Sequence, residues 1–163
     1  EILLTVPVLA SRGHRPLKMT FEDQLNALLF YHLQEHESAR ELVQCMKEDD
    51  FAKNNIAPDG GISLSSFCEG INDRGLEQLQ YVFEELCKKA RKVLPAQYSD
   101  LGDLVSIDGS LINAVLTMYW ADYRKGSKKA KGHFGFDVNR QIPLKVYLTD
   151  GNGAERPFVS SIL

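Results

Sequence analysis

The sequence has few cysteines, no long hydrophobic run, no internal repeat and no low-complexity segment. No apolar stretch approaches the roughly 20 residues that span a bilayer, so we expect no membrane partner. The three cysteines, Cys45, Cys68 and Cys87, form no close-spaced metal motif, and we interpret them as reduced core residues of a cytoplasmic protein. The chain begins at Glu1 without the basic start of a signal peptide, and we expect it to be a piece of something longer.

Basic residues are scarce over most of the chain and concentrated in one stretch. The net charge of the 163 residues is −3, but residues 124–145 hold seven basic side chains against one acid, a net +6 that leaves −9 elsewhere. Such a concentration indicates contact with a polyanion. A solvated loop is the alternative, which Gly126 and Ser127 permit, and the charge pattern leaves both open.

The first part of the chain predicts helices. After an arm at residues 1–19, apolar residues recur at helical spacing through residues 20–94. Thr20 with Asp23, and Ser38 with Glu41, predict two capping boxes, and Ser63 can cap a short helix. A short helix followed by a longer one from Leu76 is typical of helix-turn-helix architecture, and a plain bundle with an acidic exterior is the alternative. We expect a break at residues 54–61 and interpret Glu48, Asp49 and Asp50 as a solvated helix end.

A short apolar run then predicts a strand that ends in a carboxylate. Residues 104–107 favour a buried, central strand after a linker at residues 95–103, and Asp108 follows with Gly109 and Ser110. A buried, ionised Asp is costly unless something pairs with it. It could cap a helix by accepting the N–H groups of Ser110 and Leu111, or it could hold a magnesium ion. The residues alone leave both interpretations open.

The last 60 residues complete an α+β pattern. We expect a short helix within residues 110–120, because the stretch is apolar. Residues 131–139 and 142–149 read as two strands of a hairpin that turns at Asn139, Arg140 and Gln141. Glu155 begins a helix with Pro157 in its first turn.

Four motifs in this order carry a resemblance to a known family. They are Ser106-Ile107-Asp108-Gly109-Ser110, Lys128-Lys129-Ala130-Lys131-Gly132-His133, Leu148-Thr149-Asp150-Gly151 and Glu155-Arg156-Pro157. Residues 104–163 thereby resemble the DDE transposases of bacterial insertion sequences, in particular the IS-four-type group. The preceding residues 20–94 fit the family only as an all-helical region before the catalytic core.

The resemblance implies an RNase H-like core whose first three strands are antiparallel and are followed by a helix. The domains are then an N-terminal arm, a helical DNA-binding or assembly region, a linker and a partial catalytic core at residues 104–163. The family's first catalytic Asp maps to Asp108, which would help to hold two Mg²⁺ or Mn²⁺ ions for phosphoryl transfer on DNA. The family's second Asp and its Glu do not appear before Leu163.

Asp150 and Glu155 are possible substitutes for these missing ligands. Asp150 ends the third strand, and the second strand should separate it from the first by about 10 Å of backbone. We therefore interpret Asp150 as a turn residue and expect an N-terminal part of a transposase whose catalytic site is incomplete.

The expected partners are double-stranded DNA, both transposon ends and target, and further copies of the protein in the bacterial nucleoid. The predicted DNA-binding residues are Arg124, Lys125, Lys128, Lys129, Lys131, His133 and Arg140. A non-catalytic DNA-binding module that uses residues 124–145 is the alternative. A haloacid-dehalogenase-like phosphatase with Asp108 as nucleophile is disfavoured, since Ser110 stands where that family needs a second Asp.

Overall fold

The computed structural model describes residues 1–10, 16–93, 95, 100, 102–114 and 119–162. These residues form two compact units, Glu1–Phe83 and Glu84–Leu163. Together they contain six α-helices and a four-stranded antiparallel sheet, which confirms the predicted α+β class. Among the described helices, none has both the length and the apolar character to cross a membrane.

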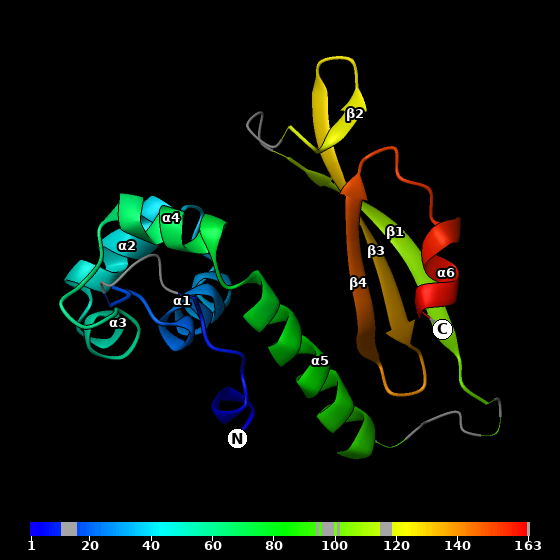
Figure 1. Cartoon of the computed structure of the whole chain (residues 1–163), viewed down its shortest axis with the longest axis horizontal. Helices are drawn as coiled ribbons and strands as arrows, with labels where there is room; N and C mark the ends of the chain where they lie inside the picture. Colours follow the sequence, from blue (N-terminus) through cyan, green and yellow to red (C-terminus); the bar gives the residue numbers. More distant parts are fainter. Residues whose placement is uncertain (11–15, 94, 96–99, 101, 115–118, 163) are drawn as a thin grey trace. The chain divides into compact units, whose positions relative to one another are not determined.

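The first unit is helical, as predicted for residues 20–94 (Figure 1). After a 3-10 helix at Ile2–Leu4, its helices are α1 (Phe21–Leu33), α2 (Ala39–Glu48), α3 (Asp50–Asn55), α4 (Leu64–Asp73) and the first part of α5 (Leu76–Val93).

Side-chain caps set the beginnings of these helices. The Thr20 hydroxyl accepts the Asp23 N–H at 3.2 Å, and the Asp23 carboxylate accepts the Thr20 N–H at 2.7 Å, so the predicted capping box is closed. Ser38 accepts the Glu41 N–H in the same way. The Glu41 carboxylate, however, accepts the N–H of Glu37, so this second box is only half formed.

Helix α3 corrects the interpretation of the acidic run. Asp49 is not merely a solvated helix end, because its side chain accepts the Ala52 N–H at 2.7 Å and caps a new helix. The backbone of Asp49 is extended, which ends α2 and turns the chain into α3. The predicted break at residues 54–61 therefore begins only after Asn55.

The core of the first unit lies between α1, α2 and α4. It contains Met19, Ala27, Leu42, Val43, Met46, Ile62 and Phe67. The buried Gln24 side chain donates to the Gly70 carbonyl at 3.0 Å, which satisfies its amide inside this apolar cluster.

The second unit is a sheet built around one long strand. Strand β3 (Ser127–Asp137) pairs antiparallel with β1 (Val105–Asn113) on one side and β4 (Ile142–Asp150) on the other, while β2 (Asp122–Arg124) forms a hairpin with its beginning. The predicted hairpin of the last two strands is confirmed, and β2 is an addition. The chain then enters α6 (Arg156–Ile162), where Pro157 occupies the first turn as expected.

Strand β1 differs from its prediction in burial, length and position. The predicted burial is wrong, because no residue of β1 is buried, and the strand continues past Asp108 instead of ending there. The expected helix within residues 110–120 is wrong for residues 110–113, which continue β1 and pair with Gly132, Lys131, Ala130 and Lys129; residues 115–118 of that expectation lie outside the described residues. Within the described sheet, β1 is an edge strand rather than a central one, since it pairs only with β3.

Helix α6 packs on one face of this sheet (Figure 1). The Phe158 ring stacks on His133 with centroids 4.5 Å apart and lies 5.2 Å from Tyr147. Gly135 permits the close approach of the helix, because a Cβ there would lie 2.3 Å from Ile162. We call this side of the sheet the α6 face. The open face carries the partly exposed side chains of Ile112, Phe136, Val146 and Leu148.

We expect Leu42→Ala to lower the free energy of unfolding of the first unit by about 2–5 kcal/mol, because Leu42 is completely buried and its removal leaves a cavity. Urea denaturation followed by circular dichroism at the helix band measures the change. Leu33→Ala is the matched control, since Leu33 on α1 is 77% exposed. Equal effects of the two variants would contradict this placement of the core.

Candidate functional site

Asp108 lies in the middle of β1, directly opposite Phe134 of β3. Because side chains alternate along a strand, Asp108 shares the open face with Ser106 and Ser110. Its carboxylate is exposed and accepts the N–H of Gly109 at 2.8 Å. The helix-cap interpretation is wrong, because Ser110 and Leu111 belong to the same strand and not to a helix.

The neighbours of Asp108 across the sheet on the open face are apolar. Phe134 lies opposite, and Val146 is the next residue across the sheet. In the part of the chain that the structure describes, no three His, Cys, Asp or Glu side chains come together as a possible metal site.

Asp150 and Glu155 lie apart from Asp108. Asp150 pairs with Ala130, four residues along β3 from Phe134, and β3 separates it from β1 as predicted. Its carboxylate accepts the N–H of Asn152 at 2.8 Å, which fits the turn role expected for it. Glu155 is bound to Lys131 at 2.8 Å, on the α6 face, opposite to the face of Asp108.

Most of the predicted basic residues lie on strands, while Lys125 and Arg140 lie in turns. Residues 127–131 belong to β3, so the alternative of a solvated loop is wrong for them. Lys128 donates to the Asp122 carboxylate across the β2–β3 hairpin and to the Tyr119 carbonyl at 3.3 Å. Lys131 is paired with Glu155, and Lys145 on β4 donates to the Ser161 carbonyl of α6.

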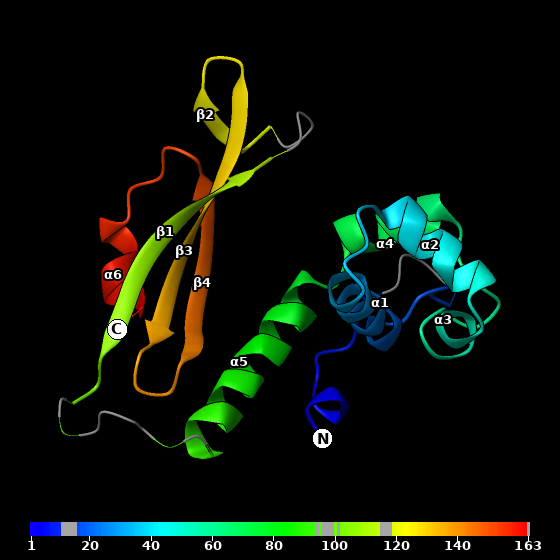
Figure 2. The same ribbon diagram turned by 180° about the vertical axis from the view of Figure 1, so that it is seen from behind.

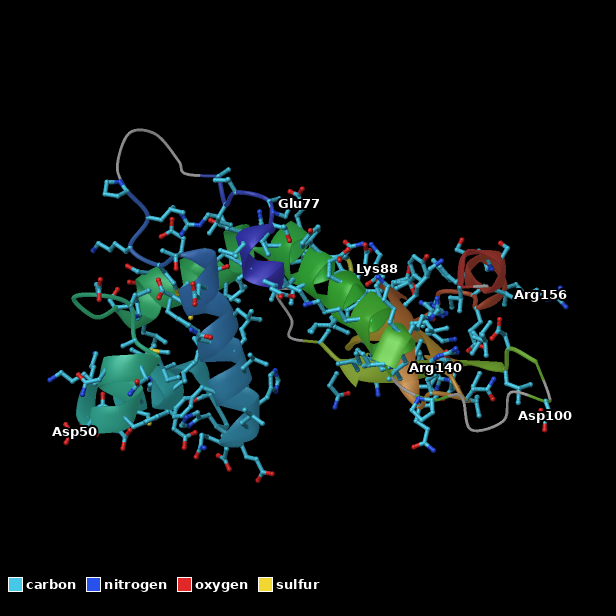
Figure 3. All side chains as sticks on the ribbon, turned by 90° about the horizontal axis from the view of Figure 1, so that it is seen from below. Asp50, Glu77, Lys88, Asp100, Arg140 and Arg156 are labelled. Carbon is cyan, nitrogen blue, oxygen red and sulfur yellow. The ribbon has the colours of Figure 1, made fainter. Side chains whose placement is uncertain are left out.

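Arg140 is engaged at the turn between β3 and β4, where Figure 3 labels it. Its guanidinium lies 3.1 Å from the Asp137 carboxylate, which also accepts the Arg140 N–H at 3.0 Å. Burial raises the pKa of Asp137, but these bonds and the charges of Arg140 and Arg91 outweigh it and hold the pKa below its ordinary value. Arg140 therefore stabilises the turn.

His133 was predicted to bind DNA, and it is completely buried on the α6 face. Its Nε2 lies 2.9 Å from the Thr149 hydroxyl, and its ring stacks on Phe158. A side chain in this position cannot reach a ligand on the surface, so the prediction that His133 contacts DNA is wrong for this fold.

The end of the β2–β3 hairpin presents cations around an aromatic ring. The Arg124 guanidinium lies 5.0 Å and the Lys129 ammonium 5.6 Å from the centroid of Tyr123. Residues 122–128 and Asn152 line a hollow of about 410 Å³ there. Sequence reasoning missed Tyr123 and Asn152. Tyr123 could have been identified as an aromatic residue directly before a basic turn. Nothing in the sequence pointed to Asn152.

We expect Arg140→Gln to lower the free energy of unfolding of the second unit by about 1.5–3 kcal/mol at pH 7, because a buried carboxylate loses a charged hydrogen-bond partner. The folded pKa of Asp137 is lowered, so this contribution is complete above its unfolded pKa of about 3.9 and disappears as the pH falls through the folded pKa. The difference in the free energy of unfolding between the parent and Arg140→Gln should therefore shrink below about pH 4.

Urea denaturation from pH 7 to pH 2, followed by Trp120 fluorescence, measures this dependence. Trp120 is the single tryptophan and belongs to the second unit. Arg124→Gln is the control, since it removes the same charge where the structure describes no carboxylate partner. A difference between Arg140→Gln and the parent that persists at pH 2 would contradict the role assigned to Asp137.

Comparisons with known proteins found no match to this chain among family models, curated proteins or solved structures.

Proposed function

We propose that this chain is the N-terminal part of a DDE transposase of the IS-four-type group. Residues 104–163 would form part of an RNase H-like catalytic core, and Asp108 would be its first catalytic carboxylate. One observation carries the proposal: an exposed Asp108 stands in the middle of the first of three antiparallel strands, in the order β1-β3-β4, with a helix following on the opposite face.

The free edge of β1 supports a larger core. In the described residues, nothing pairs with the edge of β1 that faces away from β3. Edges of this kind are normally covered or paired in native proteins. A fourth strand placed there would lie directly beside Asp108, which is where the family's second Asp is expected.

The open face supports the same proposal. Phe136, Val146 and Leu148 are 39%, 42% and 59% exposed on it. Contiguous exposed apolar groups mark a surface that another element or a partner covers. We propose that further helices of the catalytic core cover this face and bring a glutamate towards Asp108.

The metal chemistry would need more ligands than the described chain supplies. When bound, Mg²⁺ or Mn²⁺ would activate a water or a DNA 3′-hydroxyl and stabilise the leaving oxygen. The Asp108 carboxylate suits a hard cation, since its charge has no cationic partner among the described residues. It is one ligand only, and we derive no catalytic step from it alone.

The partner of the basic segment would be double-stranded DNA, at transposon ends and target, with several copies of the protein in the active complex in the bacterial nucleoid. The two units differ in charge. The first has thirteen acidic and seven basic residues, net −6, and the second has nine acidic and twelve basic residues, net +3. A negative charge repels phosphate, which favours assembly over DNA binding as the role of the helical region.

A non-catalytic DNA-binding module remains the second candidate. It is favoured by the hairpin cations at Arg124, Lys125 and Lys129, which are present whether or not Asp108 acts in catalysis. The two candidates differ in one measurable property, the metal-dependent cleavage of DNA by the protein that carries the complete core.

We expect Asp108→Asn to abolish strand cleavage by the protein that carries the complete core and to leave its DNA binding unchanged. Asparagine keeps the shape of the side chain but lacks the negative charge that a hard cation requires. Cleavage of labelled transposon-end DNA with Mg²⁺ or Mn²⁺ measures the first effect, and a mobility-shift titration measures the second.

Asp150→Asn is the matched control, because asparagine also suits the turn at that position and β3 separates it from Asp108. It should cleave like the parent. Cleavage by Asp108→Asn at the parental rate would remove Asp108 from catalysis and leave the binding-module candidate.

We expect the 163-residue chain by itself not to cleave DNA. Two-metal transfer needs cations about 3.5–4 Å apart, which several converging carboxylates must hold. Asp150 lies too far along the sheet to assist Asp108, and Glu155 lies on the opposite face of the sheet. Incubation of the purified chain with transposon-end DNA and millimolar Mn²⁺ tests this. Cleavage that disappears in Asp108→Asn would show that the remaining ligands lie within these residues.

A further inference from the structure

We infer that the end of the β2–β3 hairpin, residues 122–129, is a phosphate grip for the backbone of duplex DNA. DNA binding then belongs to this hairpin end and not to the basic segment as a whole. This binding does not depend on the catalytic role of Asp108.

The basic residues at positions 124–145 differ in whether the fold already engages them. Lys131 and Arg140 are ion-paired with Glu155 and Asp137, and Lys145 donates to the Ser161 carbonyl. Arg124 and Lys125 are exposed, and no carboxylate partner is described for either. A phosphate can therefore approach Arg124 and Lys125 without first breaking an ion pair.

The hairpin end is firmly attached to the sheet. The Gly151 N–H donates to the Asp122 carbonyl, and the Asn152 amide donates to the Tyr123 carbonyl, both at 2.8 Å. Gly151 allows this approach, since a Cβ there would lie 2.7 Å from the Tyr123 ring. Lys128 and Asp122 close the hairpin, and Gly126 takes the turn with a φ of 78°. A preorganised support of this kind reduces the entropic cost of binding.

The charges at this end match a polyanion. Four basic residues, Arg124, Lys125, Lys128 and Lys129, stand against the single acid Asp122. The Tyr123 ring lies under the Arg124 and Lys129 cations and orients them. Guanidinium and ammonium groups suit phosphates, and contacts to phosphates carry no sequence information.

The hairpin projects beyond the end of β4, as the yellow segment in Figures 1 and 2 shows. Because side chains alternate along β3, Lys129 and the Tyr123 ring beneath its ammonium lie on the α6 side of the sheet, with Lys131 and His133 and not with Asp108.

The binding part is tested on the 163-residue chain with a 30-base-pair duplex of arbitrary sequence across a salt series. Arg124→Gln combined with Lys125→Gln should reduce the log–log salt slope by about 1.8, because each neutralised phosphate contributes about 0.9. The matched control combines Lys145→Gln with Arg156→Gln, which removes the same charge near α6. Figure 3 shows Arg156 pointing away from this helix.

The control should leave the slope within about 0.3 of the parent's, since it removes no proposed phosphate contact. Equal reductions in the two double variants would mean that only net charge matters and would overturn the inference. An unchanged salt slope in the hairpin variant would also overturn the inference. Binding of the parent chain to heparin but not to the duplex would overturn it as well.

If Asp108→Asn still cleaved while the salt slopes behaved as expected, the proposed function would fail and the phosphate grip would stand.

Discussion

The pairing of β3 with strands on both of its edges is the constraint on which the second unit depends. Because side chains alternate along a strand, the register of β3 decides which residues lie under α6 and which lie on the open face. His133 points under Phe158 and meets Thr149, and Asp108 points the other way. A slip of one residue in β1 would turn the Asp108 carboxylate towards α6, where an unpaired charge is costly.

The parts of the fold that local chemistry determines were predictable. Thr20 and Asp23 lie three residues apart and close a capping box, and the turn at residues 139–141 separates two stretches of strand-forming residues. The extent of β1 was not predictable, because a short apolar run fits a strand or a helix equally well. Pairing with β3, about twenty residues away, selects the strand over the helix.

The candidate site shows the same division. The position of Asp108 on the first strand of the sheet could be read from the residues around it, and so could the turn role of Asp150. Whether each basic side chain is exposed, buried or ion-paired could not be predicted, because this depends on partners elsewhere in the chain. Arg140 meets Asp137, Lys131 meets Glu155, and His133 is buried under a helix that begins more than twenty residues later.

A count of basic residues therefore overstates what a polyanion can contact. At one end of β3, the charge of Arg140 is largely offset by Asp137, whose lowered pKa records that interaction. At the other end, Lys128 offsets Asp122, so Arg124, Lys125 and Lys129 remain to act on the surroundings. A phosphate backbone can therefore engage Arg124, Lys125 and Lys129 without displacing a carboxylate, whereas at the β3–β4 turn it would compete with Asp137 for Arg140.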